Sequence, residues 1–179
     1  MHRKNFLSER SAAFKKTFEM HAIFHHHHYL KVFADEPVPD GEDREIRMRV
    51  WKAAIKAIPF VLVIGPFSWL GAAIFVAVAC THHWIWNKIH LEMHKPEQRG
   101  FSRWPIYKFL ARYHFMHHRR PDKNFNVVFP CADFVFGTYI EPGLEDLKLM
   151  NEQGFCNPKQ IEFLKSVEER ERKTPAKCI

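Results

Sequence analysis

Histidine is the residue in this 179-residue chain whose number and spacing point most directly to chemistry. Imidazole is the commonest metal ligand among protein side chains and a frequent proton carrier. Ten of the thirteen histidines fall in three short clusters. In chain order these are His21 with His25 to His28, then His90 with His94, then His114 with His117 and His118. We therefore consider metal binding first.

The second and third clusters have helical ligand spacing. His90 and His94 are four residues apart, and the third cluster has the spacing i, i+3, i+4. Residues at these separations lie on one face of a helix, so that their imidazoles can reach one metal ion. His82 lies off the face that His90 and His94 share, and we interpret it as structural.

Ten clustered imidazoles exceed the four ligands of a tetrahedral zinc site. Imidazole also binds iron well, and a site for two metal ions needs many ligands. The sequence therefore predicts a pair of non-haem iron ions. The predicted ligands are His21, His25, His26, His28, His90, His94, His114, His117 and His118.

Two zinc-enzyme motifs are incomplete. His90 and Glu92, followed by Cys131, resemble the HxE…PCxxC pattern of zinc deaminases, but Phe134 stands where the second cysteine is needed. The segment from His90 to His94 reads HxExH rather than the HExxH of zinc proteases. Neither class of zinc enzyme is therefore predicted.

A long apolar segment indicates that part of the chain lies in a membrane. Residues 57–87 contain no Asp, Glu, Lys or Arg. A membrane-spanning helix needs about 20 apolar residues, so this run is too long for one span and short for two. Gly65-Pro66 favours a break inside it. We predict a helical hairpin, with one helix over residues 46–64 and the second over 67–94.

Basic residues flank the hairpin on both sides, which predicts that both of its ends face the cytoplasm. The N-terminal residues are polar and lack the apolar segment of a signal peptide. We predict an integral membrane protein of the endoplasmic reticulum or the bacterial inner membrane, with its metal site facing the cytoplasm. A buried helix pair in a soluble protein is the alternative.

The remaining composition excludes several classes. With 46% hydrophobic residues the chain is too apolar to be disordered, and its four cysteines form no CxxC motif. The formal net charge is +7, but no RRM, homeodomain or zinc-finger pattern accompanies it. We therefore expect no nucleic-acid partner.

The other predicted elements are also helical. We expect helices over residues 9–31, 104–120 and from Asn157-Pro158 to about 172, with a loop over 35–43. Residues 121–143 read as irregular, with one short helical turn near Asp133. The predicted fold is all-α, a membrane hairpin with a helical cytosolic cap that carries the histidine clusters.

The third cluster and the residues after it resemble a known family. The segment YHFMHHRRPDKNFNVVFPCADFVFGTY is similar to a motif of the fatty acid hydroxylase / sterol desaturase superfamily of membrane histidine-rich di-iron enzymes. The earlier clusters resemble the family's other histidine boxes. The matching residues are His114, His117, His118, Asn124, Phe125, Asn126, Pro130, Asp133, Phe136, Gly137 and Thr138.

The resemblance covers residues 1–142 and leaves 143–179 as a polar helical tail. Two ligand sets fit the first cluster: one read from His25 to His28, in which Tyr29 replaces a final histidine, and one of His21, His25 and His26. The family's first box is incomplete, because Leu7 or a neighbour stands where its second histidine belongs. The chain thus looks shortened at its N-terminus, and we expect fewer than two tightly held irons and weak turnover.

The resemblance implies a membrane enzyme of lipid biosynthesis. It implies an oxidoreductase that uses O2 to hydroxylate or desaturate a lipid such as a fatty acid or sterol. No flavin or haem motif is present, so the electrons come from an external donor of the cytochrome b5 or ferredoxin type. Asp133 and Asn124 are expected to hold a loop rather than a metal ion. The alternatives are a non-catalytic or degenerate membrane homologue, acting as a subunit or binding protein, and a soluble zinc hydrolase.

Overall fold

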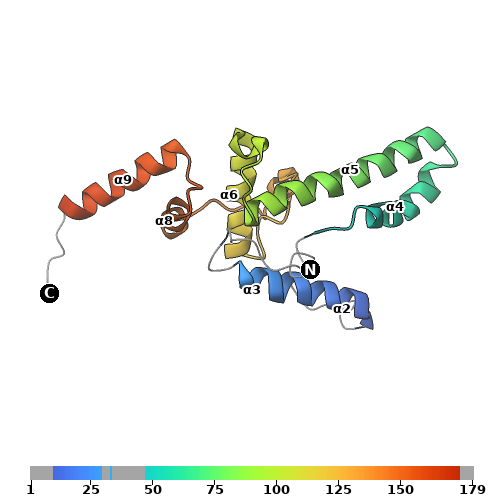
Figure 1. The fold of residues 1–179 in the computed structure, drawn as a ribbon, viewed down its shortest axis with the longest axis horizontal. Helices are drawn as coiled ribbons and strands as arrows, with labels where there is room; N and C mark the ends of the chain where they lie inside the picture. Colours follow the sequence, from blue (N-terminus) through green and yellow to red (C-terminus); the bar gives the residue numbers. More distant parts are fainter. Residues whose placement is uncertain (1–9, 30–32, 34–46, 174–179) are drawn as a thin grey trace. The chain divides into compact units, whose positions relative to one another are not determined.

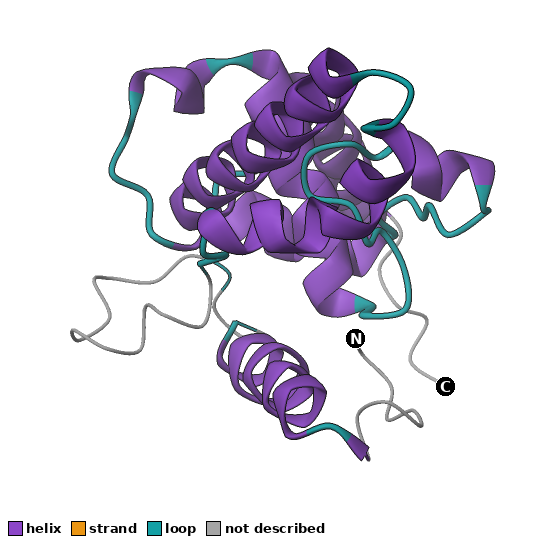
Figure 2. Ribbon diagram, turned by 90° about the vertical axis from the view of Figure 1, so that its right-hand side faces the viewer, coloured by secondary structure: helices purple, strands orange, loops and turns teal. Residues whose placement is uncertain are grey.

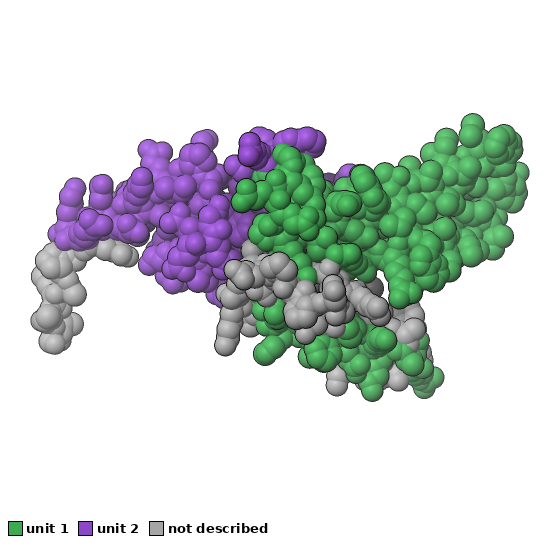
Figure 3. Space-filling view, viewed as in Figure 1, with its two compact units in different colours: residues 1–102 green, residues 103–179 purple. Residues whose placement is uncertain are grey.

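The structure is a computed structural model that describes residues 10–29, 33 and 47–173. Every regular element within these ranges is a helix (Figure 2), which confirms the predicted all-α class. The chain divides into two compact units (Figure 3). Unit 1 comprises residues 1–102 and unit 2 residues 103–179. The predicted family-like domain over 1–142 and tail over 143–179 stay predictions.

The first histidine cluster lies on a helix with a change of winding. α2 covers Ala12–Phe18, a π-helix, η1, covers Glu19–His25, and α3 covers His26–His28 (Figure 1). The described part of the predicted 9–31 helix is therefore helical, but not uniformly α. The predicted loop over 35–43 lies outside the described residues.

The charge-free segment forms two helices joined by a short turn. α4 covers Trp51–Ile64 and α5 covers Trp69–His94, and the two are in contact (Figure 1). The break falls at Gly65-Pro66 as predicted, where a Cβ on Gly65 would lie 2.8 Å from the Val61 carbonyl oxygen. Ser68 caps α5 by accepting a hydrogen bond from the Gly71 N–H at 3.0 Å.

The first helix of the pair is shorter than predicted, because it begins at Trp51 rather than near residue 46. The Asn87 side chain on α5 accepts a hydrogen bond from the Met48 N–H and donates one to the Met48 carbonyl, both at 2.6 Å. The second bond occupies the Met48 carbonyl, which would accept an intrahelical hydrogen bond if the helix began near residue 46. Asn87 thus fixes the chain just before α4.

Helix length separates the two members of the pair. α5 has 26 residues and meets the length and hydropathy needed to cross a membrane, at about 39 Å for 1.5 Å per residue. α4 has 14 residues, or about 21 Å, against a hydrocarbon core of about 30 Å. One helix among the described residues is thus a candidate span, and the second predicted span is not confirmed.

The helix pair α4 and α5 exposes large apolar side chains and buries small ones. Large side chains such as Leu62, Phe67 and Trp69 are 71%, 90% and 78% exposed, whereas Ala53 and Ala57 are buried. Only 6% of the most apolar window of α5 is buried. A core helix of a soluble protein would be mostly buried, so the exposure favours a membrane over the buried-pair alternative.

We expect the protein to remain with the membrane pellet after washing in alkaline carbonate, because α5 exposes apolar side chains along a length that can cross a bilayer. The measurement is the distribution of the full chain between pellet and supernatant. Release into the supernatant would contradict membrane integration.

The described part of unit 2 contains four α-helices, and its core lies where α8 packs on α6 and α9. α6 covers Pro105–Arg119, α7 Cys131–Val135, α8 Leu144–Glu152 and α9 Pro158–Lys173. Proline at the first position begins both α6 and α9, where a missing N–H costs nothing. These bounds confirm the helices predicted over 104–120 and from 158, and the short turn near Asp133. A short 3-10 helix, η3, covers Gly100–Arg103.

Candidate metal centre

Unit 1 brings three buried imidazoles together. His25 from η1 meets His90 and His94 from α5, with ring centroids 5.0 and 4.8 Å from that of His25 and 4.7 Å from each other. All three are at most 2% exposed, and each offers a ring nitrogen within 4.8 Å of those of the other two. This buried group is able to hold a metal ion, as the spacing of the second cluster predicts.

The π-helical winding brings two further histidines, His21 and His26, next to His25. In η1 the hydrogen bonds run from i to i+5, so residues four and five apart lie on one face. The His21 ring accordingly lies 5.4 Å from that of His25 and 5.0 Å from that of His26. This arrangement favours the ligand set of His21, His25 and His26. His28 is exposed, its ring 4.6 Å from that of Tyr29, and it does not join the group.

Two imidazoles in unit 1 are held by neighbours that set their orientation. The Nδ1 of His94 lies 2.7 Å from the Phe33 carbonyl oxygen, and the Tyr29 ring packs 4.0 Å from the His94 ring. The Trp86 ring stacks on His90 at 4.1 Å. A hydrogen bond to a carbonyl places the proton on Nδ1 and leaves Nε2 as the metal-binding atom.

Unit 2 carries a second buried set on α6. His114, His117 and His118 are at most 2% exposed, and the Nε2 atoms of His114 and His118 lie 3.0 Å apart. The Nδ1 of His117 lies 2.7 Å from the Lys123 carbonyl oxygen, the same orienting contact that His94 makes in unit 1. The predicted i, i+3, i+4 spacing does bring these side chains together.

The protonation state of these imidazoles suits coordination. Burial lowers the pKa of His25 well below its ordinary 6.5, and the neighbouring histidines lower that pKa further. Burial also lowers the pKa of His117, against the opposing effect of its hydrogen bond to the Lys123 carbonyl. Both side chains are therefore neutral at pH 7, and neutral imidazole is the form that binds metals.

The residues present fit a metal ion by the chemistry of their donors. They are buried, neutral imidazoles, and two of them have the Nδ1 position engaged by a carbonyl, which is the usual orientation of a histidine ligand. All-imidazole donors suit zinc, copper and iron alike. The structure thus supports a metal site, whereas the choice and number of metal ions belong to the proposal below.

The acidic residue inside the second cluster has a structural role. Glu92 is buried and accepts hydrogen bonds from the Arg99 and Glu97 N–H groups at 3.2 Å, from the Arg99 guanidinium and from the Ser102 hydroxyl. With its carboxylate committed to these donors, Glu92 lacks the free oxygen that a general base needs.

The loop after the third cluster is held by a single carboxylate. Asp133 accepts hydrogen bonds from the Tyr113 hydroxyl at 2.6 Å, from the Phe125 N–H at 3.1 Å and from the Asn126 N–H at 3.0 Å. It also accepts from the Asn126 side-chain amide and the Thr138 hydroxyl. Asp133 therefore organises the loop, as expected, and is committed to these protein donors.

Asn124 completes this loop. It is buried, with a positive φ of 50° that asparagine tolerates better than most residues. Its side chain accepts from the Ile140 N–H at 2.8 Å and donates to the Ile140 and Tyr113 carbonyls. The loop that supplies the Lys123 carbonyl to His117 is thus tied to the end of the motif.

Comparison with protein-family models, with curated proteins and with solved structures finds no match for this chain. Its family and its function are therefore proposals that rest on the chain's own residues.

Some residues around the histidines could not be found from the sequence. The orientation of His94 and His117 depends on contacts that only the folded chain creates. The partners are the Phe33 carbonyl, the Tyr29 ring and the Lys123 carbonyl, and no sequence motif indicates them. The contact of Trp86 with His90 was predictable, because Trp86 lies four residues before His90 on the same helix and so shares its face.

Proposed function

We propose that this protein is a membrane-bound di-iron oxygenase that hydroxylates or desaturates a lipid with O2 and an external electron donor. The observation that carries the proposal is the burial of neutral, oriented imidazoles next to an apolar helix that exposes large side chains. The proposed ligands number five in unit 1 and three in unit 2. They are His21, His25, His26, His90, His94, His114, His117 and His118.

The chain's own residues would bind the metal ions, orient the ligand imidazoles and shield the site from water. When bound, the two irons would supply activation of O2 and oxidation of a C–H bond. The Phe33 and Lys123 carbonyls hold His94 and His117 in the metal-binding tautomer. Tyr29 and Trp86 pack against the imidazoles of His94 and His90, and such packing excludes water from a reactive centre.

A lipid substrate is favoured by the apolar surfaces of the chain. α5 exposes large side chains along the length needed to cross a bilayer. In unit 2, Phe129, Phe134, Val135 and Phe136 are between 52% and 79% exposed on the loop that Asp133 holds. A group of exposed apolar side chains on an ordered loop is typical of contact with a membrane.

An external donor remains part of the proposal, because a di-iron oxygenase needs electrons that the chain itself has no motif to supply. A small acidic protein of the cytochrome b5 or ferredoxin type would be attracted to the exposed cations Arg103 and Lys108 in unit 2. The proposed location is the endoplasmic reticulum or the bacterial inner membrane, with the site toward the cytoplasm.

Lipid analysis of cells tests the function directly. Because weak turnover is expected, cells that express the chain should accumulate a small amount of a lipid that has gained one oxygen atom or lost two hydrogen atoms. Cells that express the matched His114→Ala, His118→Ala double variant should lack that lipid. Equal lipid profiles in aerated cells, with iron bound to the protein, would contradict the oxygenase and favour the non-catalytic homologue.

A further inference from the structure

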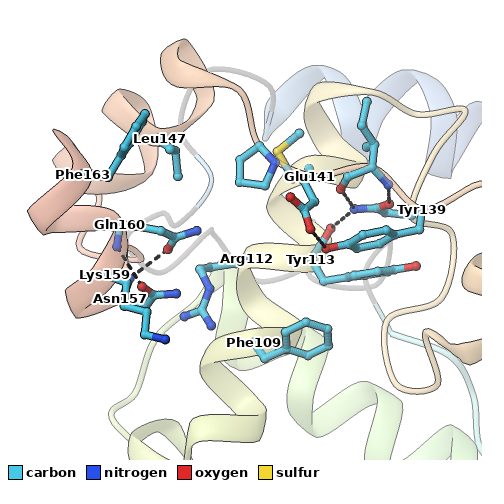
Figure 4. Close-up of a pocket in the computed structure, with 14 residues that line it drawn as sticks. Phe109, Arg112, Tyr113, Tyr139, Glu141, Leu147, Asn157, Lys159, Gln160 and Phe163 are labelled. Carbon is cyan, nitrogen blue, oxygen red and sulfur yellow. Dashed lines mark hydrogen bonds between the residues drawn. The ribbon is translucent and has the colours of Figure 1, made fainter. Parts of the chain in front are cut away.

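We propose that a cavity in unit 2 binds a small organic carboxylate with an apolar body, and that Arg112 is its anion-binding group. The cavity has a volume of about 390 Å³, within the usual range for small-molecule sites. Figure 4 shows the side chains of α6, of the segment over 139–142 and of α9 gathered around it. It is separate from the proposed metal ligands and does not rest on the proposed function.

The arginine in this cavity has few partners of its own. Arg112 is half-buried, and its Nη1 lies 3.5 Å from the Phe155 carbonyl oxygen, longer than an ordinary hydrogen bond. Within the described ranges it forms no ion pair with a carboxylate. Burial lowers the pKa of its guanidinium, which nevertheless stays charged at neutral pH. The N–H donors of the planar Arg112 guanidinium can therefore bind a ligand, and a carboxylate has the geometry to accept two of them.

The charges around the cavity set the charge of the ligand. Lys159 is the other cation that lines it, and Glu141 is its only lining carboxylate among the described residues. Glu141 accepts a hydrogen bond from the Tyr139 hydroxyl at 3.5 Å. Two positive charges against one negative leave one positive charge. The site therefore suits a singly charged anion better than a phosphate dianion.

The remaining walls favour an apolar body. Phe109 on α6 and Phe163 on α9 line the cavity, together with Leu147 on α8 and the Tyr139 ring (Figure 4). Aromatic and aliphatic walls with a few polar groups that fix orientation are typical of small-molecule sites. The ligand is thus an aryl- or alkyl-carboxylate rather than a polar sugar acid.

The cavity and the histidines occupy different faces of α6. Phe109, Arg112, Tyr113 and Met116 line the cavity and follow the spacing i, i+3, i+4, i+7 of one helical face. The histidines of the third cluster lie roughly 90° or more around the helix from the centre of that face. A ligand on Arg112 therefore does not compete for imidazoles, and loss of its binding leaves metal binding intact.

The test uses the full chain in detergent micelles and para-fluorophenylpropionate as the probe, followed by fluorine NMR. We expect saturable line broadening with the wild-type protein and none with the matched neutral amide. Arg112→Met should weaken binding by roughly 10- to 100-fold, the loss of one charge-assisted pair. Arg112→Lys should keep part of the affinity. Lys108→Met, an exposed cation on the same helix, should bind like wild type.

Three outcomes would overturn the assignment. These are equal binding of the amide and the carboxylate, equal binding by the Arg112→Met and Lys108→Met proteins, and tighter binding of phenyl phosphate than of the carboxylate. Circular dichroism of each variant shows whether the helices are retained. If Arg112→Met loses helix content, two comparisons still test whether Arg112 binds the carboxylate. These are Arg112→Lys against wild type and the amide against the carboxylate.

Discussion

Replacing His94 by alanine is expected to weaken iron binding at least about 100-fold, because even a residue that only orients a ligand changes metal affinity by roughly 10- to 100-fold. His94 is buried, touches His25 and His90, and is oriented by the Phe33 carbonyl. The measurement is iron per chain in purified protein, before and after dialysis against a chelator. The variant should keep less than half of the wild-type iron.

His27 provides the matched control for this experiment. It neighbours the first set of ligands in sequence, but it is exposed and outside both candidate groups. His27→Ala should therefore keep the wild-type iron content. If His94→Ala also keeps it while remaining in the membrane, the buried group in unit 1 does not bind the metal.

Replacing Asp133 by alanine should lower the free energy of unfolding of unit 2 by about 3 kcal/mol or more, because it leaves donors in the loop without their acceptor. Hydrogen bonds to a charged group are each worth about 1.5–3 kcal/mol. Hydrogen exchange measures the effect locally, at the Phe125 and Asn126 amides that donate to Asp133. Asp122→Ala, at an exposed carboxylate in the same loop, should leave exchange unchanged.

The same carboxylate makes this loop sensitive to acid. Burial alone would raise the pKa of Asp133, but hydrogen bonds from Thr138, Tyr113 and Asn126 outweigh it and lower that pKa from 3.8 to about 2. The lowered pKa stabilises the fold fully above pH 3.8, and this contribution is lost as the pH falls through 2. The Asp133→Asn variant should lack this part of the acid dependence. Identical acid dependence in both proteins would contradict the assigned role.

The parts of the structure that depend on local periodicity were predictable. α6 follows the spacing of the third cluster, and α9 begins at the predicted proline. The winding at the first cluster was not predictable, because the propensities that favour a helix over 9–31 do not distinguish α- from π-helical turns. The sequence therefore left two ligand sets open, and the ring contacts of His21 with His25 and His26 favour the set of His21, His25 and His26.

Features set by distant contacts also escaped prediction. The Asn87 amide holds the Met48 backbone, 39 residues away in sequence, and no sequence pattern indicates this contact. The carbonyl partners of His94 and His117 are backbone atoms, for which a side-chain pattern gives no signal. Asp133 was predictable in role, because the resemblance drew attention to it, but its individual donors were not.

Metal analysis of the purified full chain, combined with Mössbauer spectroscopy after growth on enriched iron, tests the central claim most directly. The buried imidazoles are predicted to hold iron with little zinc, and part of that iron should appear as exchange-coupled pairs, although the incomplete first box keeps the total below two tightly held irons per chain. One zinc per chain, or no stoichiometric metal in a protein that retains its helices, would contradict the di-iron account.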